Sequence, residues 1–196
     1  MAQRKSRTHR VTKETNVLAV LNLDSVKPIS ISTTIPFLDH MLELFSHHAG
    51  ISLVVKATGD THIDNHHLIE DIGIVLGTVL EQALGNKKGI GRYGSVLLPM
   101  DEALSYVALD ISGRPHIEYS AHFKHSSDSF DYDLLEDFFE AFAINARITL
   151  HMEMKKGRSN HHIAESLFKG LGRALRQAVL RSSQKNPILP STKGLL

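Results

Sequence analysis

Two hydrophobic periods alternate along the chain and predict strands followed by helices. Residues 17–23 (VLAVLNL) and 29–35 (ISISTTI) are rich in β-branched residues and alternate in polarity, which predicts two paired strands in a hairpin. Residues 37–49 carry apolar side chains three and four positions apart, which predicts a helix that ends near Gly50. Residues 51–57 (ISLVVKA) predict a further strand.

A second helix over residues 66–84, with Asn65 placed to cap it, would complete a β-β-α-β-α unit. The same order of patterns returns in the second half of the chain. Its segments are SYVALDI (105–111), PHIEYSAHF (115–123), DLLEDFFEAFAINA (133–146), RITLHMEM (147–154) and HHIAESLFKGLGRALRQAVL (161–180).

The two halves also share residues, which indicates a tandem duplication. Asn65, His66, His67, Glu70, Leu76, Gly77, Leu80, Gln82 and Ala83 each have an identical residue 95 positions later, and residues 38–53 align with 135–150 at a spacing of 97. We therefore expect an α+β fold made of two repeats, with two sheets and the helices packed between them. The expected boundaries are 8–90, 91–182 and a C-terminal tail over 183–196, with GNKKGIGRYG (85–94) as the linker.

Composition narrows the chemistry. The 196 residues contain no cysteine but 13 histidines, so a metal site would use imidazole and carboxylate ligands. The net charge of +1 comes from interspersed charges, so we expect neither nucleic-acid nor membrane binding, and a cytoplasmic protein. The one basic run, MAQRKSRTHR, is expected to be a solvated, disordered start.

The string Asn-His-His-x-x-Glu occurs in both repeats, at residues 65–70 and 160–165. On a helix His66 and Glu70 share one face, whereas His67 is turned away by about 100°. Two adjacent histidines would therefore serve two different ions. The alternative is that the histidines cap the helices or fill polar positions of the core. Duplication of the whole polar set favours metal binding.

Longer stretches resemble a known family. FLDHMLELFSHHAGISLVVKATGDTHIDNHHLIEDIGIVLG, GRYGSVLLPMDEAL, DISGRP, NARITLH, NHHIAESLFKGLGRAL and STKG are similar to those of imidazoleglycerol-phosphate dehydratases of histidine biosynthesis. The resemblance implies removal of water from imidazole glycerol phosphate to give imidazole acetol phosphate. It also implies two Mn²⁺ ions per active site and a homo-oligomer of twenty-four subunits with active sites shared between chains.

The resemblance implies two ligand sets, one for each ion. The first set is His40, His67, His161 and Glu165, and the second is His66, Glu70, His162 and Asp137. Family members commonly have a histidine at the position of Asp137, which is the repeat partner of His40. Direct ligation by Asp137, a bridge through water and loss of this ligand are all open, as is an ordinary acid on the surface of a helix.

The resemblance also implies residues for the substrate. Arg92, Arg114, Lys169, Ser191 and Lys193 match phosphate-binding positions, and the tail would close the active site. Glu14 matches the residue that moves the substrate proton. Charges on the surface are the ordinary alternative for Glu14, Arg92 and Arg114.

Two metal ions suit this dehydration because they can stabilise negative charge on the imidazole ring. The expected route expels the C3 hydroxyl from an imidazolate to give a diazafulvene, and a base then removes the C2 proton. Manganese follows from the resemblance, since imidazole ligands would also accept zinc.

Two other functions fit parts of the sequence. A metal-dependent phosphatase would use the same ligands to activate water. A duplicated α+β binding module is the second alternative, although the chain lacks the basic, aromatic stripe of RNA-binding modules.

Overall fold

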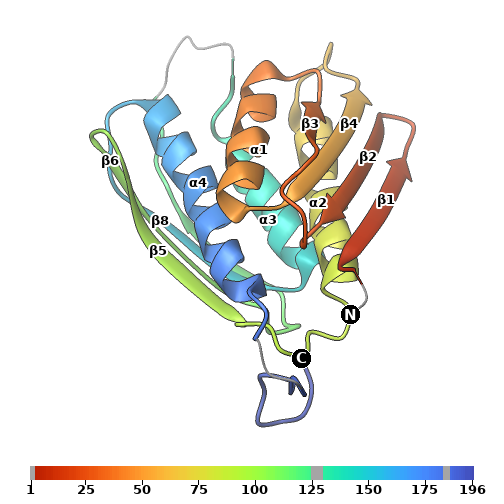
Figure 1. Ribbon diagram of the computed structural model, residues 1–196. Coiled ribbons are helices and arrows are strands. Elements are labelled where there is room, and N and C mark those ends of the chain that lie inside the picture. The colour runs from red at the N-terminus through yellow and green to blue at the C-terminus, as the bar shows by residue number, and fades with distance from the viewer. Residues whose placement is uncertain (1–2, 125–129, 183–185) are drawn as a thin grey trace.

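The computed structural model describes residues 3–124, 130–182 and 186–196 and shows two four-stranded sheets with helices between them (Figure 1). The first half contains β1 (Lys5–Val11), β2 (Thr15–Asn22), β3 (Ile29–Ser32), α1 (Pro36–Ala49), β4 (Ser52–Gly59) and α2 (His66–Leu84). The second half contains β5 (Tyr93–Met100), β6 (Ala103–Asp110), β7 (His116–Ser120), α3 (Leu134–Ala146), β8 (Thr149–Lys156) and α4 (Asn160–Val179). The duplicated α+β architecture is confirmed, and α1 ends at Gly50 as expected.

The two sheets have the same topology, with strand orders β1-β2-β4-β3 and β5-β6-β8-β7. The predicted hairpin between residues 17–23 and 29–35 is wrong. β2 instead pairs antiparallel with β4, and β3 lies on the other side of β4 as a parallel edge strand. A hairpin does open each half, but it consists of β1 and β2 or of β5 and β6.

The strands β1 and β5 are additions to the predicted order. The described part of the basic start, residues 3–10, is not a disordered segment, because its charges have partners: Arg4 Nη2 lies 2.7 Å from Asp24 Oδ1, and Arg10 Nε lies 2.8 Å from Asp71 Oδ1. β5 begins at Tyr93, inside the segment expected to be a linker. Both strands lie at sheet edges, and nearly all of their residues are exposed or only half-buried, so their hydrophobic pattern is weak.

The helices pair across the two halves. α1 packs against α4 and α2 packs against α3, while α2 covers β1 and β2 and α4 covers β5 and β6. Figure 1 shows this helical layer between the two sheets. Aromatic side chains at its centre, such as Phe138 and Phe168, are fully buried. Within the described residues, no helix is both long enough and apolar enough to cross a membrane.

Two glycines at equivalent repeat positions allow this close helix pairing. A Cβ atom added at Gly77 would lie 2.5 Å from the carbonyl oxygen of Phe142, and one at Gly172 would lie 2.6 Å from that of Phe45. These distances are shorter than van der Waals contact, so any side chain would push the helices apart. The glycines therefore fix the spacing of α2 from α3 and of α4 from α1.

Candidate metal centre

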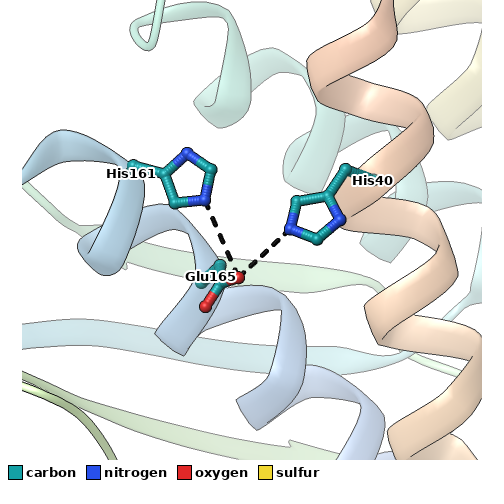
Figure 2. A group of neighbouring side chains, drawn as sticks. All are labelled: His40, His161 and Glu165. Carbon is teal, nitrogen blue, oxygen red and sulfur yellow. Dashed lines mark hydrogen bonds and ion pairs between the residues drawn. The ribbon is translucent and has the colours of Figure 1, made fainter.

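The first half and the second half together form one group of potential metal ligands. His40 on α1 points its Nε2 atom at Oε1 of Glu165 on α4, 3.2 Å away, and His161 Nε2 lies 3.7 Å from the same oxygen (Figure 2). One ligand atom from each residue lies within 4.8 Å of the other two. The packing of α1 on α4 therefore gathers three of the four ligands predicted for the first ion.

Glu165 is charged at neutral pH. Its side chain is only 8% exposed, and Lys169 Nζ donates a hydrogen bond of 2.8 Å to Oε2. Burial alone would raise the pKa of Glu165, but hydrogen bonds from Lys169 and His40 outweigh it and hold the pKa below the ordinary value. A buried carboxylate beside two imidazoles is a donor set that suits a divalent cation.

The repeat partners of these residues form a looser second group. His66 on α2 and Asp137 on α3 approach each other, with Nδ1 and Oδ2 3.1 Å apart. Glu70 lies one turn after His66 and is exposed. Asp137 therefore occupies the position in the second half that His40 occupies in the first, and it lies beside the predicted ligand His66. Its role as a metal ligand stays a prediction.

His67 and His162 lie outside both groups. His67 Nδ1 donates to Asp60 Oδ2 over 3.0 Å, and His162 Nδ1 donates to Glu102 Oε2 over 2.7 Å. These hydrogen bonds raise the pKa of both histidines. Hydrogen bonds from His162 and from the backbone of Ser159 lower the pKa of Glu102 to about 2.

Neither predicted set of four ligands is thus complete in the described part of one chain.

The starts of α2 and α4 place the histidine pairs. Asn65 occupies the N-cap position of α2, as predicted, but its side chain makes no capping hydrogen bond; Asp64 Oδ1 instead accepts the backbone N–H of His66 over 2.8 Å. Ser159 caps α4 and accepts the N–H of His162. Both histidine pairs therefore lie in a first helical turn, where i and i+4 side chains share a face.

The predicted phosphate-binding residues separate into two places. Arg92 contacts Asp110 with its Nε atom 2.7 Å from Oδ1, and it donates to the carbonyl of Pro190 over 2.8 Å. Arg114 lies 4.0 Å from the same carboxylate. The described part of the tail, residues 186–196, packs here, with Ser191 next to Pro190 and Lys193 exposed, while 183–185 lie outside the described residues.

Lys169 belongs with the histidines. Its Nζ atom lies 3.3 Å from Met100 Sδ at the end of β5, whereas Arg92 precedes the start of this strand. The eight residues of β5 span about 25 Å, so Lys169 and Arg92 of one chain lie far apart. The tail and the start of α4 accordingly lie at opposite ends of the molecule in Figure 1.

Glu14 lies in the turn between β1 and β2 and is exposed. Its carbonyl oxygen accepts the N–H of Asp60 over 3.1 Å, which keeps this turn next to the residue that holds His67. Asp60 and Glu102 were not singled out as site residues from the sequence. For Glu102 a signal existed, because residues 12–25 and 99–112 match weakly at a spacing of 88 and place Glu102 opposite Glu14, whereas Asp60 lies in a loop without any pattern.

Known proteins are similar to this chain in sequence and in fold. The sequence profile described as imidazoleglycerol-phosphate dehydratase matches residues 33–175. Imidazoleglycerol-phosphate dehydratases from Endomicrobium trichonymphae and Desulforamulus reducens are 60% and 50% identical to the chain, and each match covers 100% of both chains.

Solved structures agree with these sequence matches. A crystal structure of imidazoleglycerol-phosphate dehydratase from Staphylococcus aureus has a TM-score of 0.82 and 39% identity, and covers 91% of this chain and 99% of its own. The IGPD from Pyrococcus furiosus in complex with (S)-C348 has a TM-score of 0.83 and 38% identity, and covers 96% and 100%. The chain therefore belongs to the imidazoleglycerol-phosphate dehydratase family, the hydro-lyases that dehydrate imidazoleglycerol phosphate in histidine biosynthesis.

Proposed function

We propose that the chain dehydrates imidazole glycerol phosphate to imidazole acetol phosphate with two Mn²⁺ ions per active site. The observation that carries the metal dependence is the group of His40, His161 and Glu165, whose ligand atoms lie within 4.8 Å of one another. These residues come from both halves of the chain, and Glu165 is buried and charged. Two imidazole nitrogens and a carboxylate oxygen suit manganese, and they would also accept zinc.

We further propose that each ligand set is completed by a neighbouring chain in a homo-oligomer of twenty-four subunits. Support comes from His67 and His162, which are held by Asp60 and Glu102 through Nδ1. Nε2 of His67 makes no contact of this kind among the described residues, and Nε2 of His162 has only the exposed carboxylate of Asp101 nearby, 3.8 Å away. Their side chains are 39% and 30% exposed. On this proposal, His67 of one chain would join His40, His161 and Glu165 of another.

When bound, the two ions would supply Lewis acidity that stabilises negative charge on the imidazole ring of the substrate. The chain's own residues would then move the proton and hold the substrate. Glu14 would give a proton to the C3 hydroxyl, which leaves as water, and would then accept the proton from C2, so that Glu14 returns to its starting state and the resulting enol ketonises. Binding of the remote phosphate would orient the reacting carbons.

The phosphate would bind to a cationic group assembled from different chains. Arg92 and Arg114 both approach Asp110, and Arg92 holds the tail at Pro190, the residue before Ser191 and three before Lys193 in the chain. Lys169 would approach from the metal-binding end of a neighbouring chain. The tail would then close the active site across the subunit interface.

Metal analysis together with the mass in solution tests this proposal. The purified protein should hold about two manganese ions per chain in a very large assembly, and His67→Ala should lose metal. A metal-free monomer that is unchanged by His67→Ala would contradict it. Dehydrated ketone as the product supports the dehydratase, whereas release of inorganic phosphate would indicate the phosphatase alternative.

A further inference from the structure

Each half of the chain has a glutamate at the end of its first hairpin turn. Glu14 directly precedes β2, and Glu102 directly precedes β6. Both turns lie next to a helix that starts with a histidine pair. The two glutamates are therefore equivalent by position in the fold, although their surroundings differ.

Glu102 is fully engaged by α4 and the residues before it. Its Oε1 atom accepts the backbone N–H groups of Arg158 and Ser159 over 3.1 and 2.8 Å, and its Oε2 atom accepts Nδ1–H of His162 over 2.7 Å. Both oxygens have partners, so this carboxylate is committed to holding the loop and the imidazole ring.

The first half fills the same role with another residue. Residues 60–65 join β4 to α2, whereas only residues 157–159 join β8 to α4. The longer loop contributes Asp60, whose Oδ2 accepts Nδ1–H of His67 over 3.0 Å. Among the described residues, no side-chain hydrogen bond to the carboxylate of Glu14 is formed.

We propose that Asp60 and Glu102 are positioning residues that orient His67 and His162 for metal binding, and that Asp60 thereby leaves Glu14 free for proton transfer. This inference rests on the proposed two-metal function. A carboxylate that accepts Nδ1–H fixes the imidazole tautomer with its lone pair on Nε2 and makes that nitrogen a better ligand. The two halves would thus hold equivalent histidines with non-equivalent carboxylates.

Calorimetric titration of the metal-stripped, full-length protein with Mn²⁺ tests this inference. Glu102→Gln keeps an oxygen that accepts hydrogen bonds but loses the charge, and Asp60→Asn does the same beside His67. We expect each variant to raise the apparent Kd of one ion about tenfold or more, and the alanine variants to raise it up to about a hundredfold. The stoichiometry should stay that of the parent.

Two variants serve as controls. Glu14→Gln changes the positional equivalent of Glu102 and should lower Mn²⁺ affinity much less than Glu102→Gln does, because Glu14 acts on His67 only through its charge and not through a hydrogen bond. Glu118→Gln removes the charge from another carboxylate that contacts a histidine: Glu118 Oε1 lies 3.1 Å from His116 Nε2 on β7. This variant should leave Mn²⁺ binding unchanged. Thermal unfolding of each metal-free variant shows whether a change in affinity accompanies a loss of structure.

The outcomes separate the two proposals. A parent protein that binds two ions, with Asp60 and Glu102 variants that bind as tightly as Glu118→Gln, would overturn the positioning role alone. A Glu14→Gln variant that loses as much affinity as Glu102→Gln would overturn the division of roles between the halves. A parent protein that binds no Mn²⁺ would overturn the two-metal function and this inference together.

Discussion

His40 Nε2 lies 3.2 Å from Glu165 Oε1 although 125 residues separate the two along the chain. The contact exists because α1 of the first half packs on α4 of the second. The same exchange brings His66 of α2 to Asp137 of α3. Each group of predicted ligands therefore depends on the packing of both halves and not on one repeat alone.

Removal of the charge on Glu165 should empty one metal position. We expect Glu165→Gln to lower the manganese content from about two ions per chain to about one, because a neutral amide binds divalent cations weakly and leaves Lys169 without its anion. Elemental analysis after dialysis measures this content. Glu153→Gln is the matched control, since Glu153 on β8 also pairs with a lysine, Lys155, but its side chain is 47% exposed; equal metal content in both variants would contradict the ligand role.

Asp137 should influence which metal binds. Asp137→His would exchange an oxygen donor for an imidazole nitrogen and give the second group the same donor types as the first. Imidazole favours zinc more than carboxylate does. We therefore expect the Zn²⁺ concentration that displaces half of the Mn²⁺ at this position to be about tenfold lower for Asp137→His than for the parent protein. Competition titration measures the displacement, and identical curves for parent and variant would show that Asp137 does not ligate.

Glu14 should matter for turnover and not for binding. We expect Glu14→Gln to keep its Mn²⁺ and its substrate affinity while kcat falls about a hundredfold or more, because the amide cannot accept a proton. Steady-state kinetics with equilibrium binding of the substrate separates these effects. Turnover close to that of the parent would exclude Glu14 as the base.

Gly172 should be sensitive to a single methyl group. Gly172→Ala places a Cβ atom 2.6 Å from a backbone oxygen of α1, which cannot move aside as a flexible side chain would. Despite the better helix propensity of alanine, we expect a loss of about 2 kcal/mol in the free energy of unfolding. Urea unfolding of the metal-free protein measures the loss. The exposed neighbour Arg173→Ala is the control and should change little.

The ion pair of Arg4 and Asp24 should make stability depend on acid pH. Burial alone would raise the pKa of Asp24, but hydrogen bonds and charge from Arg4 lower it below the ordinary value. A carboxylate with a lowered pKa stabilises the fold above its unfolded pKa, and this contribution is lost as the pH falls through the folded pKa.

Asp24→Asn tests this dependence. At pH 7 we expect it to cost about 2 kcal/mol, because Arg4 is left buried without its anion. The difference from the parent should shrink as the pH falls below about 4, where Asp24 of the unfolded chain becomes protonated. Unfolding curves between pH 7 and pH 3 measure the difference, and a constant difference would contradict the assignment.

Much of the fold was predictable because its patterns are local. The helical periods gave α1 to α4, and the shared residues 65–83 revealed the duplication. Strand pairing was not predictable in the same way. Residues 17–23 and 29–35 are neighbours in sequence, yet β4 lies between β2 and β3 in the sheet, since hydrogen bonds to a more distant segment replaced the expected hairpin.

In the candidate site, too, local patterns were predictable and contacts between distant segments were not. The helix spacing of His66 and Glu70 and the repeat match of His40 to Asp137 anticipated which helices carry the ligands. The hydrogen bond from His67 to Asp60 crosses a loop with no periodicity, and that from His162 to Glu102 spans 60 residues. The repeat match to Glu14 draws attention to Glu102, but no spacing in the sequence shows that either carboxylate contacts a histidine.

The exchange of helix partners between the halves also bears on how the chain arose. A single β-β-β-α-β-α unit would expose the apolar faces of its two helices, and two such units cover each other through the pairs α1 with α4 and α2 with α3. The contacts between the two halves are thus those expected of a symmetric dimer of half-length chains. Fusion through residues 85–92 makes that association intramolecular and replaces dependence on protein concentration with a high effective concentration. Once joined, the two copies were free to diverge, and they now differ in the loop before the histidine pair, which is longer in the first half and carries Asp60 there.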